Sequence, residues 1–139
     1  MNREGKPEQK QASVTNGQIR IYTDGSGWRP GGKGSAYAYM RENGNQPAII
    51  RVFHEDGLTN NQAEYKAILS ALEFVPPGST VEILTDSENT CFQLEGERRV
   101  KDPKLAALHA QIHSVMETDQ LSVTFTWIPR RENKAGKLV

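Results

Sequence analysis

Two segments far apart in the chain end in the same way, and this repetition restricts the folds that the chain can adopt. Residues 19–23 form a β-branched, aromatic run that leads into Asp24, and residues 81–85 form an apolar run that leads into Asp86. Small residues follow each aspartate, so we predict two strands that each end in a carboxylate. If these strands are adjacent and parallel, both carboxylates lie at the sheet edge where open α/β sheets bind ligands. Two carboxylates so close repel each other unless a cation lies between them, so the pattern indicates a metal site.

Between the two strands, the periodicity of the sequence changes to that of a helix. Apolar residues recur at helical spacing from Thr59 onward, Thr59 and Gln62 match a capping box, and a Pro-Pro-Gly run at residues 76–78 ends the pattern. A right-handed crossover through this helix makes the second strand parallel to the first. Glu64 lies at the top of the apolar stripe and is therefore a third candidate carboxylate. Taken singly, Glu64 also fits a helix-dipole contact, and the two aspartates fit turn or cap chemistry.

The remaining segments predict an α/β fold with a five-stranded mixed sheet flanked by helices. Residues 35–41 and 48–53 have the pattern of two strands joined by an Asn-Gly hairpin, so strands 1 to 3 form an antiparallel meander. Residues 121–127 alternate as a fifth strand, and we expect strands 4 and 5 to run parallel to strand 1. The other predicted features are a flexible N-terminal tail over residues 1–17, one domain over residues 18–139, a short helix after Ser87, a helix over residues 103–117, and a loop or a single helical turn over residues 129–139.

The composition limits the classes of partner and compartment. The chain has 17 basic and 17 acidic residues and a formal net charge of +0, so a site for a polyanion has to be local. One cysteine, Cys91, excludes an internal disulfide and a cysteine-rich zinc site, and it fits a reducing compartment. No apolar run approaches the ~20 residues that a membrane span requires. We therefore expect a cytoplasmic protein that has no membrane contact and is a monomer.

Three motifs carry a resemblance to a known family. They are Tyr-Thr-Asp-Gly-Ser at residues 22–26, Thr-Asn-Asn-Gln-Ala-Glu-Tyr at residues 59–65 and Leu-Thr-Asp-Ser-Glu at residues 84–88. In this order and spacing they resemble the type 1 ribonuclease H family, and residues 95–103 resemble its compact subgroup, which lacks the basic protrusion. The resemblance implies a ribonuclease H-like fold and endonucleolytic hydrolysis of the RNA strand of an RNA/DNA hybrid. It also implies two divalent ions, Mg²⁺ or Mn²⁺, held by carboxylates.

The resemblance also assigns roles to individual residues. Asp24 would bridge the two ions, and Glu64 and Asp86 would each bind one of them. The residues expected to contact the hybrid are Asn60, Asn61 and Gln62 at the minor groove, Ser26 and Ser87 as short donors, and Arg130 at phosphate, with Arg131 beside it. The Gly/Pro loop over residues 27–34 is either a simple connection or a rim that contacts phosphate.

The last segment departs from the family pattern. Where the family has a fourth carboxylate after an alanine, this chain has Gly136 after Ala135. Asn133 is the candidate for the fourth catalytic and metal-binding position, and Glu132 is the alternative after a shift of register. We expect a C-terminal helix that is short or missing, and an activity that is weaker or more dependent on Mn²⁺ than that of four-acid members. Two other interpretations stay open: a catalytically weakened nucleic-acid-binding module, and an α/β domain whose acids only cap turns.

Overall fold

A computed structural model describes residues 18–32 and 34–139. The predicted N-terminal tail lies outside these residues. Within them, no helix combines the length and the apolar character that a membrane crossing requires.

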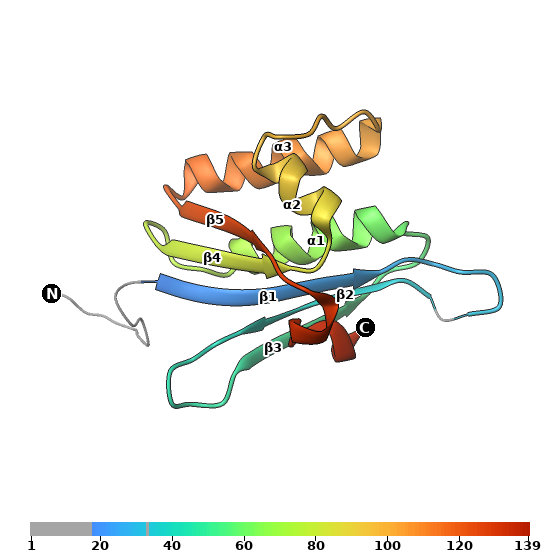
Figure 1. The fold of residues 1–139 in the computed structure, drawn as a ribbon. Helices are drawn as coiled ribbons and strands as arrows, with labels where there is room; N and C mark the ends of the chain where they lie inside the picture. Colours follow the sequence, from blue (N-terminus) through green and yellow to red (C-terminus); the bar gives the residue numbers. More distant parts are fainter. Residues whose placement is uncertain (1–17, 33) are drawn as a thin grey trace, which may run out of the picture.

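The centre of the molecule is a mixed sheet of the predicted type, with the strand order β3-β2-β1-β4-β5 (Figure 1). β1 pairs antiparallel with β2, β2 pairs antiparallel with β3, and β4 runs parallel to both β1 and β5. The strands are β1 (Gln18–Ser26), β2 (Ala36–Arg41), β3 (Ile49–His54), β4 (Thr80–Thr85) and β5 (Ser122–Trp127). The meander and the two parallel strands are confirmed.

Three helices, α1 (Asn60–Glu73), α2 (Glu88–Leu94) and α3 (Pro103–Thr118), lie on one face of the sheet (Figure 1). α1 packs against β1 and β2, and α3 packs against α1. The predicted capping box is present, because Thr59 and Gln62 exchange hydrogen bonds between their side chains and backbone N–H groups. Two short 3₁₀ turns, Arg130–Glu132 and Gly136–Leu138, stand where the sequence predicts a loop or one helical turn.

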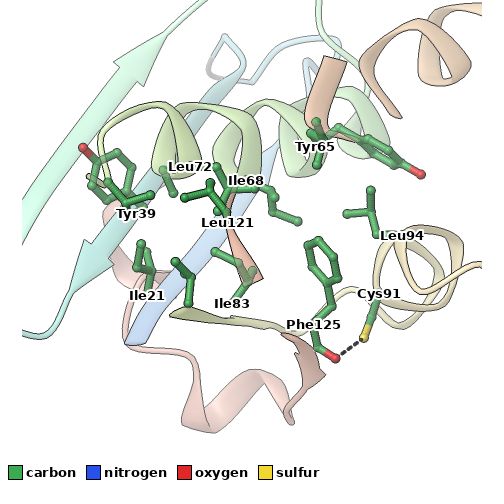
Figure 2. Close-up of a cluster of buried hydrophobic side chains, with 14 of the residues drawn as sticks. Ile21, Tyr39, Tyr65, Ile68, Leu72, Ile83, Cys91, Leu94, Leu121 and Phe125 are labelled. Carbon is green, nitrogen blue, oxygen red and sulfur yellow. Dashed lines mark hydrogen bonds between the residues drawn. The ribbon is translucent and has the colours of Figure 1, made fainter. Parts of the chain in front are cut away.

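The two faces of the sheet bury separate apolar clusters. Beneath the helices, Ile21 and Ile83 from the strands pack with Ile68 from α1, and all three are fully buried (Figure 2). On the opposite face, Tyr22 and Leu84 pack with Ile128 and Ala135 from the C-terminal segment. Adjacent strand residues point to opposite faces, so the same two strands serve both clusters. The C-terminal segment is thereby held beneath β1 and β4, next to their carboxyl ends.

β1 is longer than the sequence predicts, and the extra residues matter for the site. We expected the first strand to end at Asp24, but β1 continues through Gly25 to Ser26. A Cβ atom at Gly25 would lie 2.3 Å from the backbone carbon of Ala63 and 2.5 Å from the backbone nitrogen of Glu64. Gly25 is therefore required because α1 approaches the strand too closely for any side chain.

This contact predicts the effect of a single methyl group. We expect Gly25→Ala to lower the free energy of unfolding by about 1–3 kcal/mol, because the new Cβ can be accommodated only by moving the backbone of α1. Gly32→Ala is the matched control: the nearest atoms to its added Cβ lie 3.5 Å away. Urea unfolding followed by far-UV circular dichroism measures both variants. Equal stabilities of the two variants would contradict the prediction.

Candidate metal centre

Three carboxylates from three elements meet at the carboxyl edge of the sheet. Asp24 lies near the end of β1, Asp86 follows β4, and Glu64 is on the N-terminal half of α1, which crosses over between them. One oxygen of each carboxylate lies within 4.8 Å of the others. The parallel pairing of β1 and β4 places the aspartates side by side, and the close approach of α1 at Gly25 adds Glu64. The convergence expected from the sequence is therefore present.

The site is electrostatically strained in the absence of a cation. Asp24 and Glu64 are buried, with 4 % and 7 % of their surface exposed. Burial, together with the negative charges of Asp24 and Asp86, raises the pKa of Glu64 to about 9. Burial and the charge of Asp86 also raise the pKa of Asp24. The positive charge of Arg130 opposes both shifts. Desolvation and like charges both disfavour ionisation. Ionising all three acids without a positive partner therefore costs free energy.

The donor set fits a divalent cation of the hard, oxygen-binding kind. Asp24 Oδ1 and Glu64 Oε1 are buried and have no hydrogen-bond partner among the described residues. A buried carboxylate oxygen without a partner is costly, and a cation within the cluster would satisfy both atoms. Carboxylate oxygens are ligands of Mg²⁺, Mn²⁺ and Ca²⁺. Asp24, Glu64 and Asp86 are thus the residues that could hold such an ion.

Asn133 lies at the site, and both the nitrogen and the oxygen of its amide form hydrogen bonds. It is buried, and its Nδ2 donates to Thr23 O at 2.9 Å and to Asp86 Oδ2 at 3.0 Å. Its Oδ1 accepts the backbone N–H of Ala135 at 3.0 Å. The side chain therefore points its donor, rather than its ligating oxygen, towards Asp86. Because Oδ1 accepts the N–H of Ala135 and it is Nδ2 that contacts Asp86, the assignment of Asn133 as a metal ligand stays a prediction.

A cavity of about 380 Å³ opens over the carboxylates. Of the residues predicted to contact nucleic acid, Ser26, Asn60, Asn61, Ser87 and Arg130 line it. The residues that line it without having been assigned to the site are Gly25, Arg29, Gly136 and Val139. Arg29 belongs to the Gly/Pro loop after β1, so the interpretation of that loop as a rim is consistent with its position.

The side chains of three predicted contact residues form hydrogen bonds within the protein. The side chain of Gln62 accepts the N–H of Thr59 at 2.9 Å, and Gln62 does not line the cavity. Asn60 Oδ1 accepts the N–H of Gly27 at 2.6 Å, which ties the Gly/Pro loop to the start of α1. Ser87 caps α2 through Thr90. The capping box was visible in the sequence, and it is the feature that assigns Gln62 to the helix rather than to the cavity.

The fourth acidic position has no carboxylate in the structure. Gly136 lines the cavity, and a Cβ atom there would lie 3.7 Å from Asp24 Oδ2, an ordinary van der Waals contact. The alternative candidate, Glu132, is exposed and is not among the residues that line the cavity. Gly136 is therefore the position from which a longer side chain would reach the carboxylates.

The fold and the site together define an α/β protein with an acidic, cation-type centre at the edge of a five-stranded mixed sheet. A model of the RNase H family matches residues 16–135. The chain belongs to the RNase H family.

Individual relatives agree with this assignment. RNase H1 of the halophilic archaeon Halobacterium salinarum is 25% identical and superposes with a TM-score of 0.74, covering 88% of this chain and 93% of that one. LC11-RNase H1, isolated from compost by a metagenomic approach and solved in complex with an RNA/DNA hybrid, is 28% identical with a TM-score of 0.74, covering 86% of this chain and 91% of that one. The bifunctional protein Rv2228c of Mycobacterium tuberculosis is 32% identical over 77 residues, which are 54% of this chain and 21% of that protein. The matched region thus spans about a fifth of the length of that curated relative.

The shifted pKa of Glu64 predicts a pH dependence of stability in metal-free protein. Since this pKa is about 9 in the folded chain against an ordinary 4.5, folded Glu64 holds a proton over a range in which the unfolded chain has lost it. Unfolding then releases a proton, so the free energy of unfolding falls as pH rises between these values, with a limiting slope of about 1.4 kcal/mol per pH unit. Glu64→Gln removes this contribution to the pH dependence, because a glutamine side chain does not titrate.

The measurement is the difference in unfolding free energy between Glu64→Gln and the unchanged chain, with EDTA present, at about pH 5.5 and about pH 8. We expect the stability of the variant relative to the unchanged chain to be greater at the higher pH. Titrating groups that do not interact with Glu64 contribute equally to both proteins, so their contributions cancel. A difference that is independent of pH would show that Glu64 titrates normally.

Proposed function

We propose that this chain is a metal-dependent endonuclease that hydrolyses the RNA strand of RNA/DNA hybrids with two divalent ions, Mg²⁺ or Mn²⁺. The observation that carries the proposal is the convergence of Asp24, Glu64 and Asp86 within 4.8 Å, with unpartnered buried oxygens on two of them. Membership of the RNase H family and the likeness to LC11-RNase H1, which was solved with a hybrid, support the substrate class.

The bound ions would supply Lewis-acid activation of water and stabilise the leaving oxygen at phosphorus. The residues of the chain provide the geometry. Asp24, Glu64 and Asp86 would hold the ions, and the resemblance to the family implies that Asp24 would be shared by both. Asn133 would keep the Asp86 carboxylate in place through its 3.0 Å hydrogen bond. This role resembles that of other groups that orient metal ligands from outside the coordination shell.

Polar groups around the cavity suit a nucleic acid. Asn60 and Asn61 stand at the first turn of α1, where amide groups can both donate to and accept from ribose hydroxyls and base edges. Arg29 and Arg130 line the same cavity, and their guanidinium groups would pair with backbone phosphates. These cations provide the local basic site that a chain of zero net charge needs.

Asp24→Asn tests the proposed chemistry. We expect cleavage of a labelled RNA/DNA hybrid to fall by on the order of a thousandfold or more in either metal, because Asp24 is the carboxylate that both ions would share. The matched control is Asp102→Asn, which changes an aspartate that caps α3 away from the site. Hybrid binding by the unchanged chain without any metal-dependent cleavage would favour the alternative, a weakened nucleic-acid-binding module.

Gly136→Asp tests the fourth position. Because the added Cβ has room beside Asp24 Oδ2, a carboxylate there would increase the negative charge offered to the ions. We expect the Mg²⁺ concentration for half-maximal cleavage to fall by on the order of tenfold, and the preference for Mn²⁺ to decrease.

Gly136→Asn is the isosteric control, since it adds the same volume without the charge. It should leave the metal dependence close to that of the unchanged chain. Equal Mg²⁺ activity of the unchanged chain and Gly136→Asp would refute a deficit at the fourth position.

A further inference from the structure

A second pocket, of about 160 Å³, lies at the other end of α1 from the carboxylates. Tyr39 and Arg41 are two residues apart on β2 and share a face of the sheet, and Arg51 pairs with Tyr39 across the β2–β3 ladder. Ile49 pairs with Arg41 in the same way. Ala71 on the last turn of α1, and Phe74 and Val75 directly after the helix, close the pocket. We call this the arginine pocket.

The arginine pocket carries two positive charges and no negative one. Arg41 Nε is buried and has no hydrogen-bond partner among the described residues. Neither Arg41 nor Arg51 forms an ion pair within 4.0 Å with any carboxylate of residues 18–32 or 34–139, including Glu73 on the last turn of α1. The carbonyl end of α1 offsets part of this charge. The arrangement still leaves a guanidinium partly desolvated with an unused donor.

The directions in which the pKa values of Arg41 and Tyr39 are shifted agree with this geometry. Burial lowers the pKa of Arg41, although a guanidinium stays charged in proteins. Burial raises the pKa of Tyr39, and the nearby charges of Arg51 and Arg41 oppose that rise. Both guanidinium groups therefore lie close enough to the Tyr39 hydroxyl to act on it. Figure 2 shows this hydroxyl at the margin of the core, directed away from the apolar cluster.

Arg41 is partly buried, and its buried Nε has no hydrogen-bond partner among the described residues. Such a donor is costly to desolvate, and an anion of matching geometry would satisfy it. Two planar guanidinium forks and a hydroxyl donor suit the tetrahedral oxygens of phosphate. The volume is well below the roughly 300–1,000 Å³ of sites that enclose whole small molecules. Such a pocket holds one phosphate group and leaves the rest of a ligand outside.

We propose that the arginine pocket is a phosphate-binding site, separate from the carboxylate site, in which Arg41 and Arg51 bind the phosphate group of a small anion. Phe74, 60 % exposed at the rim, presents a ring on which the base of a nucleoside monophosphate could stack. The two sources of phosphate, inorganic phosphate and a nucleoside monophosphate, share the same contacts with the arginines. The two cavities have no lining residue in common, so this proposal does not depend on the nuclease proposal.

The test is a titration of the full, ¹⁵N-labelled chain with sodium phosphate, followed by amide chemical shifts, against sodium chloride at the same ionic strength. We expect saturable shifts at Arg41, Arg51 and Phe74 with phosphate only. Arg41→Gln should weaken binding by about tenfold or more, because a charge-assisted hydrogen bond contributes that much to affinity. Adenosine 5′-monophosphate is titrated in parallel. Tighter binding of it, lost in Phe74→Ala, identifies a nucleotide as the better ligand, and equal binding identifies phosphate alone.

Thermal unfolding gives a second readout. Phosphate should raise the thermal unfolding midpoint of the unchanged chain but not that of Arg41→Gln. The control is Arg98→Gln, which alters an exposed arginine, and its midpoint should rise as in the unchanged chain. Arg41→Gln without phosphate should be about as stable as the unchanged chain, since Arg41 forms no ion pair with the described residues that the substitution would break. Hybrid cleavage should be the same in both variants. Shifts that persist in the Arg41→Gln, Arg51→Gln double variant, or that chloride reproduces, would overturn the proposal.

Discussion

The contact between Gly25 and the backbone of α1 is the interaction on which the rest of the site depends. Without a side chain at Gly25, the peptide units at Ala63 and Glu64 come close enough to the strand to bring a helix carboxylate beside Asp24. The parallel pairing of β1 with β4 adds Asp86 from the other side. Helix capping at Thr59 then fixes where α1 begins. The pairing of the two strands and the close backbone contact at Gly25 thus bring the three carboxylates together.

The carboxylates repel one another, so the fold has to hold them against their own electrostatics. The surrounding apolar clusters on both faces of the sheet supply the stability that allows this, because hydrophobic burial is the dominant favourable term in folding. A proton on Glu64, whose pKa is raised, relieves this repulsion, and a bound cation would relieve it as well. Asn133 ties the C-terminal segment to the same place through Thr23 and Asp86. The fold itself therefore brings the three acids together, which is the arrangement that metal-assisted chemistry requires.

Although the formal net charge is +0, charged side chains of opposite sign gather around the two ends of α1. Near its N-terminus lie three acids, and near its C-terminus lie Arg41 and Arg51. Each end collects charge that burial makes costly, and each is suited to an ion of the opposite sign. This distribution explains how a chain without a global field can carry both a cation site and a proposed anion site.

The sequence by itself determined the order and type of the elements, the capping box of α1 and the meeting of Asp24, Glu64 and Asp86. These follow from local periodicity and from the rule that parallel neighbouring strands end at the same sheet edge. Only the tertiary structure decided that β1 runs on through Gly25 and that Asn133 turns its nitrogen to Asp86. It alone brought Arg41 and Arg51 into one pocket. Such contacts join residues that are distant in the chain, and they depend on strand register and on the distance between packed backbones, which no local pattern encodes.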